Sequence, residues 1–193
     1  MPFSETERVF LLLNFYFMSQ KKKLQIGIIG SAGAFDQGDA DEKMLVLAKR
    51  LGELLAQAGA VVVTGGKDGI MEAAAAGAKA AGGLNVGVVR GPQRFTSNPY
   101  IDIEVISGMA VEGMDELTLV LMCDALILVG GGAGSLQEVA LAYRNNKPII
   151  ALSASGGWAE RLAGQYLDGR RRVLIQAAAS PEEAVSLALA SLN

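Results

Sequence analysis

The amino-acid sequence predicts an α/β protein with three layers, in which helices cover both faces of a mostly parallel sheet of about seven strands. Short apolar runs alternate with longer amphipathic segments, which is typical of parallel strands joined by helical crossovers. Of the 193 residues, 51% are hydrophobic and only 19% are charged, as suits a sheet that is buried on both faces. The length fits one domain of this kind.

The individual elements follow in order along the chain. Apolar runs predict strands at residues 24–29, 60–63, 85–89, 101–106, 125–129, 149–152 and 173–176. Helical periodicity predicts helices at residues 39–58, 109–122 and 135–143, an alanine-rich helix that ends near 82–83, a helix starting at 156–158 and a C-terminal helix from 181. Ser180 and Pro181 have the residue types of an N-cap and a first helical position.

Three helices allow finer predictions. In the helix at 39–58, Gly59 takes the C-cap position, and the face predicted to pack inward carries Leu45, Ala48, Leu51, Leu54 and Leu55. In the helix at 109–122, the inward face is predicted to carry Met114, Leu117, Val120 and Leu121. Asp68 is a candidate N-cap for the alanine-rich helix, and Asp115 and Glu116 are first-turn acids that favour the helix dipole.

Residues 1–23 differ from the rest of the chain. The apolar run from Val9 to Met18 is too short to span a bilayer, and the basic trio Lys21–Lys23 follows it, whereas a signal peptide carries its positive charge first. We therefore expect an N-terminal extension at 1–23, as an extra helix or an upstream start before Met18. Residues 24–193 are expected to form a single nucleotide-binding domain of a cytoplasmic protein without a membrane segment.

The composition excludes several functions. The net charge is -3 and no long basic run occurs, so the sequence argues against nucleic-acid binding. Cys123 is the only cysteine, which rules out an intrachain disulfide. The chain contains no histidine, and this absence excludes a Ser-His-Asp triad and any metal site that contains histidine. No metal site is expected.

The principal candidate site follows the strand at 125–129. Gly131, Gly132, Gly134 and Ser135 form a glycine-rich turn into a helix, and Glu138 lies on its first turns. Unpaired backbone N–H groups at a helix N-terminus bind a phosphate without any cationic side chain. A plain tight turn is the alternative interpretation.

Two further glycine-bearing turns belong to the predicted site. Gly65, Gly66 and Gly69 follow the second strand, with Lys67 placed to reach a phosphate or to stay solvated. Gly30 and Ser31 follow the first strand, but the spacing from Gly30 to Gly33 is not the dinucleotide fingerprint, so NAD is not expected.

The loop at 90–100 leaves the third strand on the side where ligands bind in open α/β sheets. Arg90 and Arg94 lie in this loop and are candidates to pair with an acidic ligand.

With these loops identified, the chain resembles the family of cytokinin-activating phosphoribohydrolases, formerly called lysine decarboxylases. Its motif P-G-G-x-G-T-x-x-E corresponds to Gly130–Glu138, with Gly in place of Pro and Ser in place of Thr, and its loop G-G-G-x-x-G-L-M corresponds to Thr64–Met71. The resemblance implies a Rossmann-like sheet, a homodimer or higher homo-oligomer, and a nucleoside monophosphate or similar phosphorylated ligand. In an enzyme of this family, Glu138 would be catalytic.

One departure from that family bears on activity. Where the family's Arg-Lys pair opens the helix before the central strand, this chain has Asp115 and Glu116. The chain also resembles a smaller branch of the superfamily, which includes molybdenum cofactor carrier proteins, through Asn98–Tyr100 and Gly156–Trp158. This second resemblance favours binding over turnover.

Three hypotheses remain open from the sequence. The first is a carrier or binding protein for a phosphorylated nucleotide or molybdopterin-type ligand, held at the two glycine-rich loops with no cofactor required. The second is an enzyme that hydrolyses the N-glycosidic bond of a nucleoside 5′-monophosphate, with Glu138 acting on the ribose and Arg90 or Arg94 replacing the family's missing Arg. The third is a structural dimer whose glycine loops bind no ligand.

Overall fold

The computed structural model describes residues 22–32, 42–108 and 114–192. Seven strands form one sheet in the order β4-β3-β2-β1-β5-β6-β7, and every pair of neighbouring strands is parallel. The strands are β1 (Gln25–Gly30), β2 (Val61–Thr64), β3 (Asn85–Val89), β4 (Ile103–Ile106), β5 (Ala125–Val129), β6 (Ile149–Leu152) and β7 (Ile175–Ala178). The predicted three-layer fold is confirmed.

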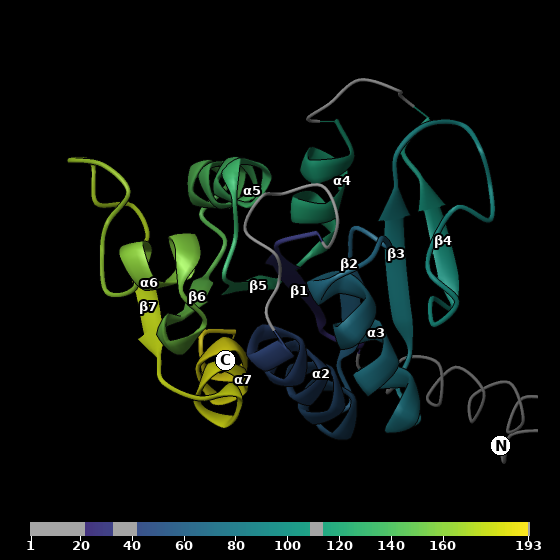
Figure 1. Cartoon of the computed structure of the whole chain (residues 1–193). Helices are drawn as coiled ribbons and strands as arrows, with labels where there is room; N and C mark the ends of the chain where they lie inside the picture. The colour runs from purple at the N-terminus through teal and green to yellow at the C-terminus, as the bar shows by residue number, and fades with distance from the viewer. Residues whose placement is uncertain (1–21, 33–41, 109–113, 193) are drawn as a thin grey trace, which may run out of the picture.

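Helices cover both faces of the sheet (Figure 1). They are α2 (Glu42–Gln57), α3 (Ile70–Ala80), α4 (Met114–Met122), α5 (Ala133–Arg144), α6 (Gly157–Leu162) and α7 (Pro181–Ala190), with a 3-10 turn at Ser153–Ser155. One core lies between the sheet and α2, α3 and α7, and a second lies between the sheet and α4, α5 and α6. None of the helices described is long and apolar enough to cross a membrane.

The alternation of side chains along β5 shows how the sheet supplies both cores. Ala125, Ile127 and Val129 belong to the first core, while Leu126 and Leu128 belong to the second. All five are fully buried, because successive side chains of a strand point to opposite faces. A central strand of a doubly covered sheet must therefore be apolar throughout, and this is why β5 was easy to recognise in the sequence.

Small residues bring α2 and α3 close together. A Cβ atom added at Gly52 would lie 2.0 Å from the carbonyl oxygen of Ala74, and one at Gly77 would lie 2.0 Å from that of Lys49. Neither glycine can be replaced without moving the helices apart. The pair thereby fixes α3, whose N-terminus borders the pocket described below.

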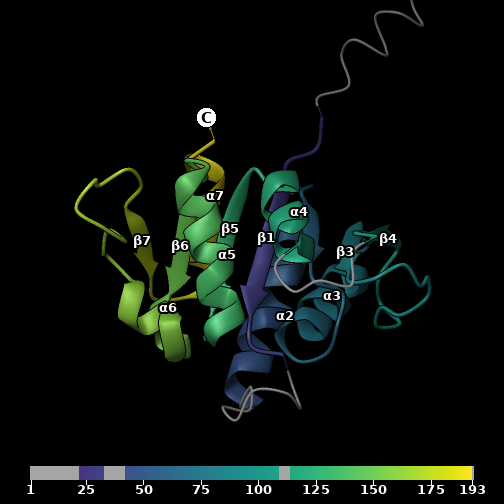
Figure 2. The same cartoon turned by 90° about the horizontal axis from the view of Figure 1, so that it is seen from above.

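The strand order reverses between β1 and β5. From β1 the chain builds β2, β3 and β4 on one side, and from β5 it builds β6 and β7 on the other. Figure 2 shows the strands of the two halves running side by side. Ligands of open α/β sheets bind outside the carboxyl ends of the strands at such a reversal, and the glycine-rich turns after β1 and β5 lie there.

Some details differ from the sequence predictions. Asp68 is not the N-cap of α3, because the helix begins one residue later and Gly69, with φ +64°, takes that position. Leu121 faces outward with 52% of its surface exposed, while Leu119 and Val120 are buried. The inward position predicted for Val120 is therefore confirmed, whereas that predicted for Leu121 is wrong and Leu119 is buried instead.

Two further predictions are confirmed, one strand begins later than predicted, and some predictions concern residues that the structure does not describe. Ser180 accepts a hydrogen bond from the backbone N–H of Glu183, as expected of an N-cap, and Gly59 has the positive φ of a C-cap glycine. The predicted strand at 173–176 begins two residues later, at Ile175. Residues 1–21, which hold most of the predicted extension, and Gly33 lie outside the described residues.

Candidate ligand-binding pocket

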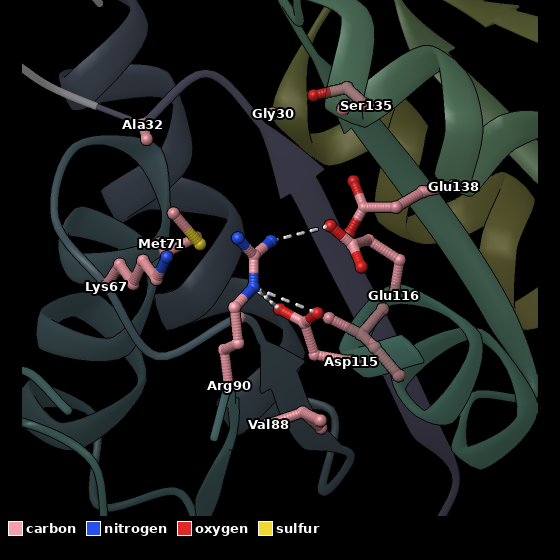
Figure 3. A pocket seen from close by; sticks show the side chains of 13 residues that line it. Gly30, Ala32, Lys67, Met71, Val88, Arg90, Asp115, Glu116, Ser135 and Glu138 are labelled. Carbon is pink, nitrogen blue, oxygen red and sulfur yellow. Dashed lines mark hydrogen bonds and ion pairs between the residues drawn. The ribbon is translucent and has the colours of Figure 1, made fainter. Parts of the chain in front are cut away.

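A pocket of about 160 Å³ lies at the reversal of strand order (Figure 3). It is lined by the ends of β1 and β3, by the turns that follow β1, β2 and β3, and by the N-terminal parts of α3, α4 and α5. The lining residues are Gly30, Ala32, Gly65, Lys67, Met71, Val88, Arg90, Asp115, Glu116, Leu119, Gly134, Ser135 and Glu138. The turns after β1 and β2 and the N-terminus of α5, which are separate in the sequence, thus meet in one place.

The N-terminus of α5 forms one wall. Gly132 is the N-cap, no side chain in the described part of the chain caps it, and the first turn carries no acidic residue. A Cβ atom on Gly134 would meet no atom within 4 Å, so its backbone is open to an approaching group. This helix end keeps its partial positive charge and its N–H donors available for an anion.

Ser31 and Gly131 brace the loops and do not line the pocket. The Ser31 hydroxyl accepts a hydrogen bond from the N–H of Gly131 at 3.2 Å, and the N–H of Ile70 donates to the Ser31 carbonyl at 3.2 Å. Ser155 accepts from the N–H of Gly130 at 2.7 Å. Since the N–H of Gly131 is already bonded, the donors available to a ligand lie farther along the turn.

In the turn after β2, some residues line the pocket and others only shape the turn. Gly65 and Lys67 line the pocket, whereas Gly66 and Gly69 have φ values of +70° and +64° and shape the turn. The Cβ position of Gly66 lies 3.2 Å from the Cα of Gly87, so the turn packs tightly against β3. Gly132 likewise serves as the N-cap of α5 and is not among the lining residues.

Arg90 enters the pocket and pairs with two acids of α4. Its Nε lies 3.2 Å from Oδ1 and 3.3 Å from Oδ2 of Asp115, and its Nη2 lies 3.2 Å from Oε1 of Glu116. Only 12% of the Asp115 side chain and 15% of the Glu116 side chain are exposed. Arg94 is not a lining residue, and its guanidinium stacks 4.9 Å from the centre of the Phe95 ring.

Glu138 adds a third carboxyl group beside this ion pair, and Figure 3 shows it pointing toward Glu116. Burial raises the pKa of Glu138 to about 8, with further contributions from the negative charges of Glu116 and Asp115. Burial and the neighbouring Asp115 also raise the pKa of Glu116. Glu138 therefore holds a proton at neutral pH, so that it donates as well as accepts hydrogen bonds.

One oxygen of Glu116 has no hydrogen-bond partner among the described residues. Its Oε2 is buried and makes no hydrogen bond to the described residues, although Oε1 is paired with Arg90. Buried polar atoms are normally satisfied, and carboxyl groups with perturbed pKa values gather at functional sites. The acidic side of the pocket thus suits a ligand with hydroxyl or N–H groups.

The sequence indicated the glycine turns and Arg90 as site residues but not the pairing of Arg90 with α4. Arg90 and Asp115 are 25 positions apart, and their contact depends on how the N-terminus of α4 lies against the end of β3. Val88, Leu119, Met71 and Ala32 were also missed, because apolar lining residues look like core residues in a sequence. No cluster of metal-binding side chains occurs within the described ranges.

Comparison with known proteins places the chain among relatives of similar size. A profile of the SLOG cluster4 family matches residues 23–185. A protein of Archaeoglobus fulgidus is 38% identical over 131 residues, which cover 68% of this chain and 81% of that protein.

Two solved structures are similar in fold and sequence. The molybdenum cofactor binding protein of Rippkaea orientalis superposes with a TM-score of 0.77 at 30% identity, covering 90% of this chain and all of that one. The Moco carrier protein of Chlamydomonas reinhardtii gives a TM-score of 0.72 at 33% identity, covering 89% of this chain and 98% of that one.

Proposed function

This chain belongs to the SLOG cluster4 family, and from that premise we propose that it binds a phosphorylated nucleotide or nucleotide-like ligand, of the molybdopterin type, as a carrier or binding protein. The resemblance to molybdenum cofactor carrier proteins, expected from the sequence, is confirmed by the structures of similar fold. The observation that carries the proposal is the uncapped N-terminus of α5, which opens into a pocket at the reversal of strand order.

The phosphate end of the ligand is assigned to Gly134, Ser135 and Lys67. The first-turn N–H groups of α5 and the Ser135 hydroxyl supply donors, and the Lys67 ammonium supplies the positive charge that a phosphate requires. Gly65 and Gly30 leave space at the adjoining turns. Gly66, Gly69, Gly131, Gly132 and Ser31 support the site by shaping its loops.

The acidic side is assigned to the polar part of the ligand next to the phosphate. Glu138 lies one helical turn beyond Ser135, and its carboxyl group and that of Glu116 face the same space. A ribose hydroxyl or a ring N–H group satisfies these oxygens, whereas a second anion would be repelled. The pocket of about 160 Å³ is smaller than those that enclose whole ligands of drug size, so we expect part of the ligand to lie outside it.

Calorimetry of the purified protein with nucleoside monophosphates and with molybdopterin tests this proposal. We expect one of these ligands to bind, and Ser135→Ala to weaken that binding about tenfold, since a hydrogen bond to a charged group is lost. Ser186→Ala, at an exposed position of α7, is the matched control. Absence of binding by every ligand in the series would contradict the proposal.

Hydrolysis of a nucleoside 5′-monophosphate is the second candidate function. Glu138 and Arg90 favour it, because a carboxyl group with a raised pKa and a guanidinium lie in one pocket. Arg90 is nevertheless paired with Asp115 and Glu116, and these acids occupy the positions of the family's Arg-Lys pair. Chromatography for free base after incubation with AMP distinguishes the functions: base release that Glu138→Ala abolishes would favour hydrolysis.

A homo-oligomer, most simply a homodimer, is the assembly expected from the resemblance. Light scattering after size-exclusion chromatography measures it directly. A monomer at micromolar concentration would remove the structural dimer from the hypotheses without affecting the binding function.

A further inference from the structure

The loop between β3 and β4 is fastened to the turn that carries Lys67, and Asn98 makes the connection. The backbone N–H of Asn98 donates to the carbonyl of Gly66 at 2.8 Å. Its side-chain Nδ2 donates to the carbonyl of Lys67 at 2.7 Å. Two consecutive carbonyl groups of the turn after β2 are therefore held by a single residue.

Asn98 is itself locked in place by the residues that follow it. Its Oδ1 accepts a hydrogen bond from the N–H of Tyr100 at 3.1 Å, and its backbone carbonyl accepts from the N–H of Ile101 at 3.2 Å. This is a turn with Asn at the first position and Pro99 at the second, a favoured combination. Pro99 also restricts the backbone of Asn98. All of the hydrogen-bonding groups of Asn98 are thus engaged, with Nδ2 directed at Lys67.

Glu104 anchors the same loop from the sheet edge. Its carboxylate accepts the backbone N–H of Phe95 at 2.6 Å and that of Ser97 at 2.9 Å. A hydrogen bond from the Ser97 side chain, together with these backbone hydrogen bonds, lowers the pKa of Glu104 to about 2. Phe95 has a φ of +61°, an uncommon value for a residue other than glycine, and the bond to Glu104 offsets its strain. A continuous series of contacts therefore runs from β4 through the loop to Lys67.

We propose that Asn98 is a positioning residue, which fixes the backbone at Lys67 so that its ammonium stays in the anion pocket. This inference rests on the proposed function in that Lys67 is taken to contact the phosphate. A lysine on a mobile turn loses side-chain and backbone entropy when it engages a ligand. Holding the backbone beforehand removes part of that loss, so Asn98 acts on affinity without contacting the ligand.

Asn98→Ala removes the bond to Lys67 without adding a charge. Asn98→Asp keeps the shape of the side chain and the acceptor for the Tyr100 N–H but presents an acceptor where Nδ2 donated, and its negative charge by itself repels a phosphate. Asn98→Ala is therefore the principal variant and Asn98→Asp the second. Gln93→Ala, at an exposed position in the same loop, is the matched control, and thermal unfolding of each variant shows whether the fold is retained.

The binding test is a double-mutant cycle with Lys67→Ala, with AMP and inorganic phosphate as the probes. We expect Asn98→Ala and Lys67→Ala each to weaken binding about tenfold, as for the loss of a hydrogen bond to a charged group. The double variant is expected to bind no more weakly than the weaker-binding single variant, because both changes remove one interaction. Multiplicative losses, or unchanged binding in Asn98→Ala, would overturn the inference.

A measurement without ligand separates this inference from the proposed function. The rate at which an amine-acylating reagent modifies Lys67, followed by peptide mass spectrometry, is expected to rise at least about threefold in Asn98→Ala and to stay unchanged in Gln93→Ala. If no probe binds the wild-type protein, the proposed phosphate site fails but the positioning of Lys67 is still judged by this rate. An unchanged rate in both Asn98 variants would overturn it.

Discussion

Three carboxyl groups lie beside one guanidinium in the pocket. This excess of acidic groups determines which of them keeps its proton. Arg90 is shared between Asp115 and Glu116, so Glu138 has no cation of its own among the contacts described. Burial raises its pKa, and its neighbours are negative, so the proton is retained. A neutral Glu138 lowers the repulsion that an incoming phosphate would otherwise meet.

Glu138→Gln is therefore expected to stabilise the protein in alkaline solution relative to the wild type. The pKa of Glu138 is about 8 in the folded state against a usual value of 4.5. Between these values the unfolded chain releases a proton that the folded protein keeps. This group's contribution to the free energy of unfolding then falls as pH rises, by at most about 1.4 kcal/mol per pH unit.

Denaturant unfolding at several pH values measures this effect. The stability of Glu138→Gln minus that of the wild type is expected to rise between about pH 5 and pH 8 and to level off above. Glu160→Gln, at an exposed position of α6, is the control and should follow the wild-type profile. Parallel profiles for Glu138→Gln and wild type would show that Glu138 ionises as in water.

Among the elements, α5 shows most clearly that the residues expected to contact the ligand differ from those that hold the helix in place. The loop that leads into α5 is held by α6, since the N–H of Ala159 donates to the carbonyl of Gly130 at 2.9 Å. A Cβ atom on Gly157 would lie 2.8 Å from the carbonyl carbon of Gly130. Ligand contact at Gly134 is consequently independent of the contacts that hold the turn.

Gly134→Ala is expected to weaken phosphate-ligand binding without destabilising the fold. The added methyl group meets no protein atom within 4 Å, and alanine favours a helix over glycine by up to about 1 kcal/mol. The methyl group does enter the space assigned to the phosphate, so affinity is expected to fall about tenfold through lost charge-assisted bonds. Gly169→Ala, which also meets no atom within 4 Å, is the control, and calorimetry with thermal unfolding gives both quantities.

The helices and strands also show what sequence patterns determine and what they leave open. Strands β3, β5 and β6 were predicted with their observed limits, because continuous apolar runs leave no other choice. Helix α4 was placed correctly and Val120 packs inward as predicted, but Leu121 does not. The second half of the helix is almost entirely apolar, with Leu117, Leu119, Val120 and Leu121 within five positions. The spacing of apolar residues therefore does not decide which side of the helix packs on the sheet. Burial of Leu119 instead of Leu121 is a tertiary effect.

At the scale of the whole molecule, the topology explains why the site could be predicted only in part. Parallel strands place all their carboxyl ends on one side, so the glycine turns were expected to meet, and they do. Which of their residues face the ligand depends on loop contacts such as that between Ser31 and Gly131. The partnership of Arg90 with α4 depends on the spacing of two elements that no local pattern encodes.

The reactivity of the only cysteine of the chain measures how often the core of the fold opens. Cys123 is fully buried between α4 and β5, and burial raises the pKa of its thiol well above its usual range. A Cβ atom on Gly27 of β1 would lie 2.8 Å from its Sγ, so the thiol is enclosed by the centre of the sheet. A reagent reaches it only when the core opens, and such opening requires much of the free energy of global unfolding.

Alkylation by iodoacetamide is therefore expected to be slower at Cys123 than at an exposed thiol by several orders of magnitude, and to accelerate in denaturant. Val46→Cys, at a position with 63% of its surface exposed, supplies the exposed thiol in the same molecule. A ligand that binds only the folded protein shifts the opening equilibrium, so a ligand at a hundred times its Kd should slow Cys123 alkylation about a hundredfold. Rapid alkylation of Cys123 without denaturant would mean that α4 separates from the sheet locally. The acidic wall of the pocket, which α4 provides, would then be a mobile part of the site.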